Sequence, residues 1–393
     1  MRKILLICLL TCISVVYGEE TIDTLCPTAS VIKTPRSGVL GLYDRVVGYF
    51  NKANEPHPEK KLDISFIGGP HYSSEAGFGI GVVGSGIYYT RRDSLGRPDA
   101  STPASSLSVK LDVTTGQLYK VSGDGYHIFG GDRFRINYDG YFYSFKDKFW
   151  GVGYENGSQK DNESIFTRLQ AQIRADFVIN FSHRLFLGPL ARFNYVNATR
   201  IDRPELFEGQ RARTFSTGIG VTAFYDTRDY PLNAYKGVFV RVDQIFNPHF
   251  LGNHYAFAET DFTAVIYASL WKGAVLASRL HADLTYGNTP WGLMPTFGGS
   301  VAMRGYYEGR YRDKCETDIT VELRQHVWRR NGLVVWVGAG TVYPKFSAIR
   351  WRHILPNYGI GYRWQFKPRV NVRLDLGFGR GDKGINFSIN EAF

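Results

Sequence analysis

The residues of this chain best suited to acid–base chemistry are His281 and Asp283, which lie two positions apart. Residues two apart on a β-strand point to the same face, so an imidazole and a carboxylate would stand side by side. Such a pair activates water when a substrate lies within hydrogen-bonding reach. The segment around them alternates apolar and polar residues, which is also typical of side chains that line a water-filled interior. We favour this second interpretation and expect no enzyme activity.

A second candidate is the glycine pattern in GFGIGVVG, where Gly79, Gly81 and Gly84 match a nucleotide-binding motif by letter. A dinucleotide site also needs a helix that opens at the third glycine and an acidic residue further on. Here a strand pattern continues to Tyr89, so we interpret the glycines as small residues that face an interior. The histidines form no H-E-x-x-H motif, and the cysteines have no metal-ligand spacing. We therefore expect no cofactor and no metal.

The third candidate is Arg304, in the segment GGSVAMRGYYEGRYRDK (298–314). Its neighbours Gly305 and Tyr306 permit a tight turn and supply an aromatic ring for packing. A guanidinium is always charged and presents a rigid fork of donors, which paired carboxylates can hold in place. Which carboxylates hold it depends on the elements on either side of this segment.

Those elements are strands, because apolar and polar residues alternate along most of the chain after residue 62. In TDITVELRQHVWRR, Ile319, Val321 and Leu323 alternate with charged and hydroxyl side chains. Period-two patterning predicts strands with one apolar and one polar face. The segments exceed the roughly 5–6 residues usual in soluble sheets and suit the roughly 9–11 residues of a transmembrane strand. Aromatic residues, 15% of the chain, gather at strand ends, as at membrane interfaces.

We count sixteen such segments and predict an all-β fold, a transmembrane antiparallel β-barrel over residues 62–393. An even strand count places both termini on the periplasmic side, with short turns there and longer loops outside. On this count residues 298–314 lie in the sixth outer loop. The predicted strands span 62–68, 76–90, 105–114, 116–128, 132–146, 165–181, 184–197, 212–225, 236–247, 254–271, 273–287, 316–328, 331–343, 355–367, 369–379 and 384–393.

The N-terminus has the features of a secretion signal over residues 1–18. Arg2 and Lys3 precede a short apolar stretch that ends at a cleavage site after Gly18. Residues 19–61 are expected to form a short periplasmic segment with one helix near 38–52, where apolar residues recur at helical spacing.

Charge and cysteine content exclude some partners. Removal of the signal takes away two cations, so the net charge falls from +11 to +9. The remaining cations alternate with acids, so we expect no nucleic acid partner. We expect contact with outer-membrane lipid and lipopolysaccharide instead. Cys26 and Cys315, which remain after cleavage, lie far apart and make no disulfide framework.

Four stretches resemble the BamA-type outer-membrane assembly and translocation barrels, also called bacterial surface antigens. The resemblance covers about residues 62–393. It rests on the sixth-loop segment MRGYYEGRYRDK, the third-loop segment FWGVGYENG (149–157), the turn YDTRDYPLNAYKG (225–237) and the last strand, GINFSINEAF. In the turn, the matching residues are Asp226, Arg228, Asp229 and Gly237. The last strand is represented by Gly384 and Phe393.

The resemblance implies that the sixth loop folds back into the barrel, where inward-facing acids hold Arg304. The family's usual Phe-x-Asp-x-Gly pattern is replaced here by Trp336-Val337-Gly338-Ala339-Gly340, so its acid is missing. By face alternation, Glu322 and Asp375 are the nearest inward carboxylates, and we expect them to be the acid partners.

The resemblance also implies a noncovalent function, in which a lateral seam between the first and last strands opens to insert outer-membrane proteins. Gly377, Gly379, Gly381 and Gly384 would suit bending near this seam. Residues 19–61 are too short for one of the family's polypeptide-transport (POTRA) modules, each about 75 residues, which puts the insertase role in doubt. The alternatives are a structural or accessory subunit that inserts nothing, and a passive pore. Expected partners are nascent outer-membrane proteins, other outer-membrane or periplasmic proteins, or further copies of the chain.

Overall fold

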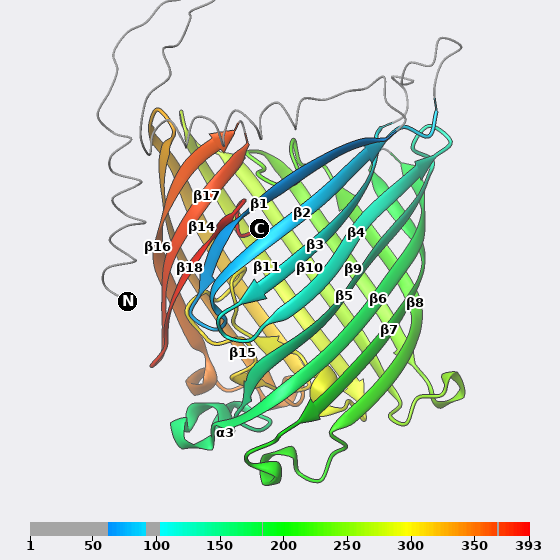
Figure 1. Ribbon diagram of the computed structural model, residues 1–393, viewed down its shortest axis with the longest axis vertical. Coiled ribbons are helices and arrows are strands. Elements are labelled where there is room, and N and C mark those ends of the chain that lie inside the picture. Colours follow the sequence, from blue (N-terminus) through cyan, green and yellow to red (C-terminus); the bar gives the residue numbers. More distant parts are fainter. Residues whose placement is uncertain (1–61, 92–102, 183, 368) are drawn as a thin grey trace, which may run out of the picture. The chain divides into compact units, whose positions relative to one another are not determined.

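The computed structural model describes residues 62–91, 103–182, 184–367 and 369–393. The predicted secretion signal and the predicted helix near 38–52 lie outside these residues. In the part described, sixteen antiparallel strands form a closed barrel, from β1 through β11 and from β14 through β18 (Figure 1). The predicted architecture and strand number are confirmed.

The strand bounds follow the sequence pattern closely. The barrel strands are β1 (Asp63–Ser73), β2 (Gly77–Tyr88), β3 (Ser105–Thr114), β4 (Tyr119–Phe129), β5 (Phe134–Phe149), β6 (Ser164–Ser182), β7 (Leu185–Thr199), β8 (Arg213–Asp226), β9 (Gly237–Asn247), β10 (Phe257–Ser269), β11 (Ala274–Gly287), β14 (Cys315–Trp328), β15 (Asn331–Tyr343), β16 (Leu355–Lys367), β17 (Val370–Gly379) and β18 (Lys383–Ile389).

Two strand ends differ from the prediction by four residues or more. β1 continues past residue 68 to Ser73, pairing with β2 along its whole length. β18 ends at Ile389 rather than at residue 393. The reason is Asn390, whose φ of 72° is left-handed and turns the chain away from the sheet. The last residues therefore enter the barrel instead of completing the strand.

The two ends of the barrel carry different connections. We call the end where β1 begins and β18 ends the terminal rim, and the opposite end the loop rim. Connections at the loop rim contain the helical turns, as α3 illustrates in Figure 1. These turns are α3 (Tyr154–Ser158), η1 (Lys160–Asn162), η2 (Pro204–Phe207), η3 (His249–Leu251), η4 (Trp291–Leu293), η5 (Phe346–Ala348) and η6 (Trp351–His353).

The barrel wall is apolar outside and polar inside. Ile80 and Val337 are 67% and 63% exposed on the outer face, whereas Thr320 and Glu322 are fully buried inside. A continuous apolar belt of this kind suits contact with lipid rather than with water. Among the residues described, no helix has the length and apolar character to cross a membrane.

The glycines of the rejected nucleotide motif need one correction. Gly79 and Gly81 lie on the lumen side of β2, and Gly79 packs beside the His71 ring. Gly84 has the opposite parity and lies beside Phe66, an exposed residue of the outer face. Only the first two glycines therefore face the interior as expected.

Candidate functional site

The sixth loop, residues 288–314, folds into the barrel rather than over it. Inside, β12 (Thr296–Phe297) pairs with β13 (Tyr311–Arg312) to form a small hairpin. Phe297, Met303 and Tyr306 are buried in a cluster with wall residues of β15 and β16. Because these apolar side chains are shielded by packing, the loop is part of the protein core.

The third loop covers the sixth. Gly153 N donates a hydrogen bond of 2.7 Å to Arg312 O, and Arg310 Nε donates one of 2.9 Å to Gly157 O. The Tyr154 and Tyr311 rings stack with centroids 5.6 Å apart. Two segments that the resemblance singled out separately, 149–157 and 303–314, are therefore in direct contact.

Arg304 is fully buried at the tip of the loop and contacts both acids assigned by face alternation. Its Nη1 donates a hydrogen bond of 2.7 Å to Asp375 on β17, and its Nη2 donates to Glu322 on β14. Both carboxylates are fully buried as well. The three side chains tie the loop to two separate strands of the wall.

Trp336 and Asn357 also contact Arg304. The alternation pattern of the sequence does not predict a role for either residue. The Arg304 guanidinium lies 3.6 Å from the centroid of the Trp336 ring, within cation–π range. Trp336 Nε1 donates to Asn357 Oδ1 at 2.8 Å, and Asn357 Nδ2 donates to Arg304 O at 2.6 Å. The inward position of Trp336, where the family pattern has Phe, was the available clue.

Gly377 and Gly379 make room for the sixth loop, and Gly305 allows the loop itself to turn. Gly305 has a φ of 119°, which residues with a Cβ rarely adopt. At Gly377 of β17, a Cβ atom would lie 2.0 Å from Arg304 O. A Cβ on Gly379 would meet the Tyr306 ring at 2.3 Å. Gly377 and Gly379 thus allow close approach of the loop, a role different from the bending expected from the sequence.

Arg304 also belongs to a closed ring of six buried charges, which we call the charge ring. It alternates three arginines with three acids, and every neighbouring pair lies within ion-pair distance. Glu322 Oε1 is 2.7 Å from Arg324 Nε, Glu391 Oε2 is 2.8 Å from Arg363 Nε, and Asp375 Oδ1 is 2.6 Å from Arg363 Nη1. The Arg324–Glu391 pair closes the ring at 3.8 Å.

The turn between β8 and β9 lies at the terminal rim. Asp226 accepts two hydrogen bonds from the Arg228 guanidinium, at 3.0 and 2.7 Å. Asp229 accepts from Tyr235 N at 2.9 Å and from Arg369 Nη2 at 2.9 Å. Because Arg369 precedes β17, this turn bridges distant parts of the rim.

Gly237 ends the same turn with a φ of 116°. A Cβ there would lie 2.5 Å from Thr227 O, so the turn requires glycine at this position.

The first and last strands meet along a short seam. β1 and β18 pair at two positions, Tyr72 with Phe387 and Ser73 with Asn386. By contrast, β1 pairs with β2 along all 11 of its residues. Gly384 lies at the loop-rim end of β18, against Gly305. Phe393, expected in the last strand, lies inside the barrel instead.

The ion-pair partners of His281 are acids on the two neighbouring strands, β10 and β14. His281 Nδ1 lies 3.0 Å from Glu316 and 3.3 Å from Asp318. These three side chains have the donor types for a metal ion. Arg279 already pairs with Asp318 at 2.8 Å, which offsets part of the negative charge. The geometry suits a polar lumen network.

Fold and site together define a class of protein: a sixteen-stranded membrane barrel whose sixth loop is held in the lumen by a buried arginine. The chain belongs to the Omp85 superfamily, because the family model of the Omp85 superfamily domain matches residues 98–393. This fold indicates the bacterial outer membrane as the location of the protein.

Solved structures share the barrel fold. BamA from Haemophilus ducreyi lacking POTRA domains 1–3 has a TM-score of 0.58 at 12% identity, over 84% of this chain and 70% of that chain. CdiB from Acinetobacter baumannii has a TM-score of 0.52 at 13% identity, over 84% and 60%. CdiB from Escherichia coli has a TM-score of 0.57 at 10% identity, over 85% and 64%. No curated protein sequence matches the chain.

The stacking of Arg304 on Trp336 predicts different costs for two substitutions. Trp336→Phe keeps an aromatic face but removes the hydrogen bond to Asn357, and is expected to cost about 1 kcal/mol of unfolding free energy. Trp336→Leu also removes the cation–π contact and leaves a cavity, at about 2–3 kcal/mol. Denaturant unfolding in detergent micelles measures both, and equal costs would contradict a role for the ring face.

A contact between two acids predicts a pH dependence at the loop rim. Glu75, between β1 and β2, accepts a hydrogen bond of 2.7 Å from Glu308 N of the sixth loop. Burial, followed by the charge of Glu308, raises the pKa of Glu75 from 4.5 to about 8. Between these values the folded protein retains a proton that the unfolded chain has released. Stability contributed at this site therefore falls as pH rises through that window.

We expect Glu75→Gln to reduce this pH dependence. The thermal unfolding temperature of the wild type should fall more than that of the variant between about pH 5 and pH 8. Parallel curves for the two proteins would contradict the assignment to Glu75.

Proposed function

We propose that this protein inserts or translocates other proteins at the outer membrane, through a seam between β1 and β18 that opens sideways. The observation that carries the proposal is the contrast in pairing, with two residue pairs at the seam against 11 between β1 and β2. Membership of the Omp85 superfamily and the similarity to BamA and CdiB barrels support a general assembly or translocation role.

An open strand edge provides the mechanism. Among the residues described, Ile64–His71 of β1 have no ladder partner in β18, so the main-chain groups on that side of β1 form an open edge. Unpaired main-chain groups are costly in lipid, and an incoming strand satisfies them by adding to the sheet. The edge would then template the first strand of a client. In this arrangement both termini lie on the periplasmic side.

The sixth loop holds together the part of the wall that lies beside the proposed seam. Arg304 ties β14 to β17 through Glu322 and Asp375, whereas β18 pairs with β17 along its whole length and with β1 at only two positions. A loop that occupies the lumen fits a passive pore less well. The accessory-subunit alternative makes the opposite prediction for seam opening, and the following experiment separates the two.

A disulfide across the seam tests the proposal. Ser73→Cys with Asn386→Cys would join β1 to β18 where the strands pair. The matched control, Ser85→Cys with Ser108→Cys, joins β2 to β3. In liposomes, the seam disulfide should stop the protein from accelerating the folding of an added barrel client, and a reductant should restore it. Undiminished acceleration by the oxidised seam variant would contradict opening at the seam, and no acceleration by the reduced protein would favour the accessory role.

A further inference from the structure

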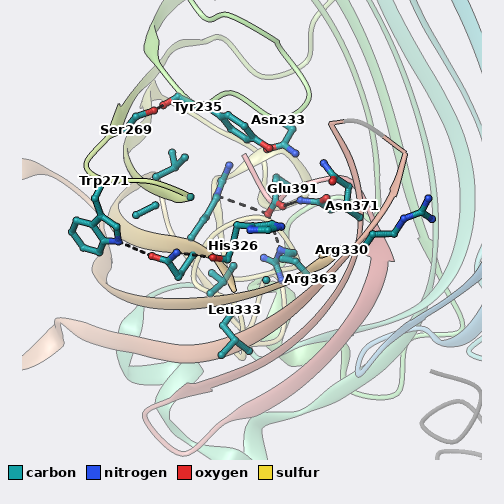
Figure 2. Close-up of a pocket in the computed structure, with 18 residues that line it drawn as sticks. Asn233, Tyr235, Ser269, Trp271, His326, Arg330, Leu333, Arg363, Asn371 and Glu391 are labelled. Atoms are coloured by element: carbon teal, nitrogen blue, oxygen red, sulfur yellow. Dashed lines mark hydrogen bonds and ion pairs between the residues drawn. The ribbon is translucent and has the colours of Figure 1, made fainter. Parts of the chain in front are cut away.

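A pocket of about 250 Å³ lies at the terminal rim (Figure 2). Strands β14 to β17 and the turns after β8 and β10 contribute its walls. Its polar residues include Arg324, Arg363 and Asn371, with Glu391 among them. Figure 2 shows Glu391 between Asn371 and Arg363, connected to both by hydrogen bonds.

Glu391 forms part of the wall of this pocket, and residues 391–393 are held beside it by arginines that also line it. Glu391 accepts hydrogen bonds from Arg363 Nε at 2.8 Å and from Asn371 Nδ2 at 2.6 Å. Its side chain is 1% exposed. Arg324 Nη2 donates a hydrogen bond of 2.9 Å to the main-chain oxygen of Phe393. A carboxylate and a main-chain oxygen are thus each bound by an arginine.

Beside the arginines lies an apolar surface that receives an aromatic ring. Phe393 packs against a buried cluster that includes Val265, Tyr267 and Ala277. The Arg324 guanidinium also lies 5.5 Å from the centroid of the Phe393 ring. The site therefore accepts a carboxylate and, two residues later, an aromatic side chain.

The tail does not use all the donors that the pocket offers. Arg324 and Arg363 are 7% and 4% exposed. Arg324 Nη1 and Arg363 Nη2 have no hydrogen-bond partner among the residues described. A buried donor without an acceptor is costly, so a ligand with further acceptors would be favoured over the tail. The charge of both side chains selects an anionic ligand.

Residues 390–393 also have an alternative position, in line with β18 along the edge of β1. In the β1–β18 register, Tyr72 lies opposite Phe387 and Ser73 opposite Asn386. Because the two strands are antiparallel, each residue further along β18 lies opposite the residue one position earlier in β1. If β18 continued straight, Asn390 would therefore face Gly69, and Phe393 would face Phe66. That part of the β1 edge has no β18 partner among the residues described, so a released tail could pair there.

We propose that the pocket, together with the adjoining site that holds residues 391–393, binds an extended peptide segment with a carboxylate two residues before an aromatic side chain, and that residues 391–393 are the exchangeable occupant of that site. Arg363 and Asn371 bind the carboxylate, Arg324 binds the main chain, and the apolar cluster receives the ring. The site does not depend on the proposed insertion function, because a barrel that inserts nothing can still bind such a segment.

A labelled copy of the chain's own end tests the site. The probe is a fluorescein-labelled peptide of sequence NFSINEAF, residues 386–393, and the proteins are full-length barrels in detergent micelles. In a Glu391→Gln, Phe393→Ala variant the tail loses both anchors and no longer competes. Fluorescence anisotropy should show that this variant binds the probe at least about tenfold more tightly than the wild type, a difference of about 1.4 kcal/mol.

Two controls show whether binding uses the pocket. Probes with Gln in place of the Glu, or Ala in place of the Phe, should bind the variant at least about tenfold more weakly. Adding Arg363→Gln to the variant should abolish the gain, whereas Arg350→Gln, an exposed loop residue, should leave it unchanged. If the double variant does not fold, full-length Glu391→Gln replaces it, with the same expected direction. Equal affinity of wild type and variant, or equal affinity for the altered probes, would overturn the proposal.

Discussion

Replacing Arg304 with alanine is expected to destabilise the barrel by on the order of 3–5 kcal/mol, the usual cost of removing one partner from a buried ion pair. The substitution leaves Glu322 and Asp375 without their shared cation, and both carboxylates are fully buried. It also removes the guanidinium from the face of Trp336. The loop would then lose its ion pairs to β14 and β17 together.

Denaturant unfolding in micelles measures this cost, and limited proteolysis reports release of the sixth loop. Arg304→Lys should recover only part of the stability, because an ammonium group cannot reproduce the planar fork that reaches two carboxylates. Arg350→Ala, in an exposed part of the seventh loop, is the matched control and should change little. An Arg304→Ala protein as stable and protease-resistant as the control would contradict the account of the loop.

Gly377→Ala is expected to cost about 3 kcal/mol, toward the upper end for overpacked sites. The added Cβ would lie 2.0 Å from the main-chain oxygen of Arg304. Neither backbone can move easily, because Gly377 is paired within the sheet and Arg304 is held by Asn357 and two acids. The loop must therefore shift, which weakens its ion pairs as well.

Gly81→Ala in β2 is the control for this substitution. Its Cβ would meet Leu111 O at 3.7 Å, an ordinary contact, so we expect a change of less than about 1 kcal/mol. Unfolding measurements on both variants, with proteolysis of the sixth loop, separate a general effect of alanine from displacement of Arg304. Similar stability of the two variants would contradict the close approach at Gly377.

The barrel was predictable because alternation records which side of each strand meets lipid. Val337 faces outward and Glu322 inward, and a register error of one residue would reverse both. The same parity argument selected Glu322 and Asp375 as inward acids, and the structure places both on Arg304. Parity gives the face of a residue and leaves open its height in the barrel or its partner.

What the sequence did not predict depends on contacts between distant segments. Asn390 looks like any polar residue near a strand end, yet its left-handed backbone turns the tail inward. Glu391 then contacts Arg363, and this closes the charge ring. The role of Gly377 is likewise not visible in the sequence, because it depends on the sixth loop that lies against this residue. Such features follow from tertiary packing and leave no periodic pattern.

Crosslinking at the seam in living cells is the most direct test of the proposed function. A photoreactive residue would replace Phe66 on β1 or Ile389 on β18, both exposed beside the seam. Ser388, also on β18, is not used as a crosslinking position, because its side chain accepts a hydrogen bond of 2.6 Å from Arg373 that the substitution would remove. Val335, exposed in the middle of the sheet on β15, is the control position.

We predict that both seam positions form adducts with newly made outer-membrane proteins, and that these adducts disappear as the clients mature. Val335 should form none of them. Lasting adducts to a single abundant partner, or the same adducts at all three positions, would contradict client handling at the seam and favour an accessory subunit.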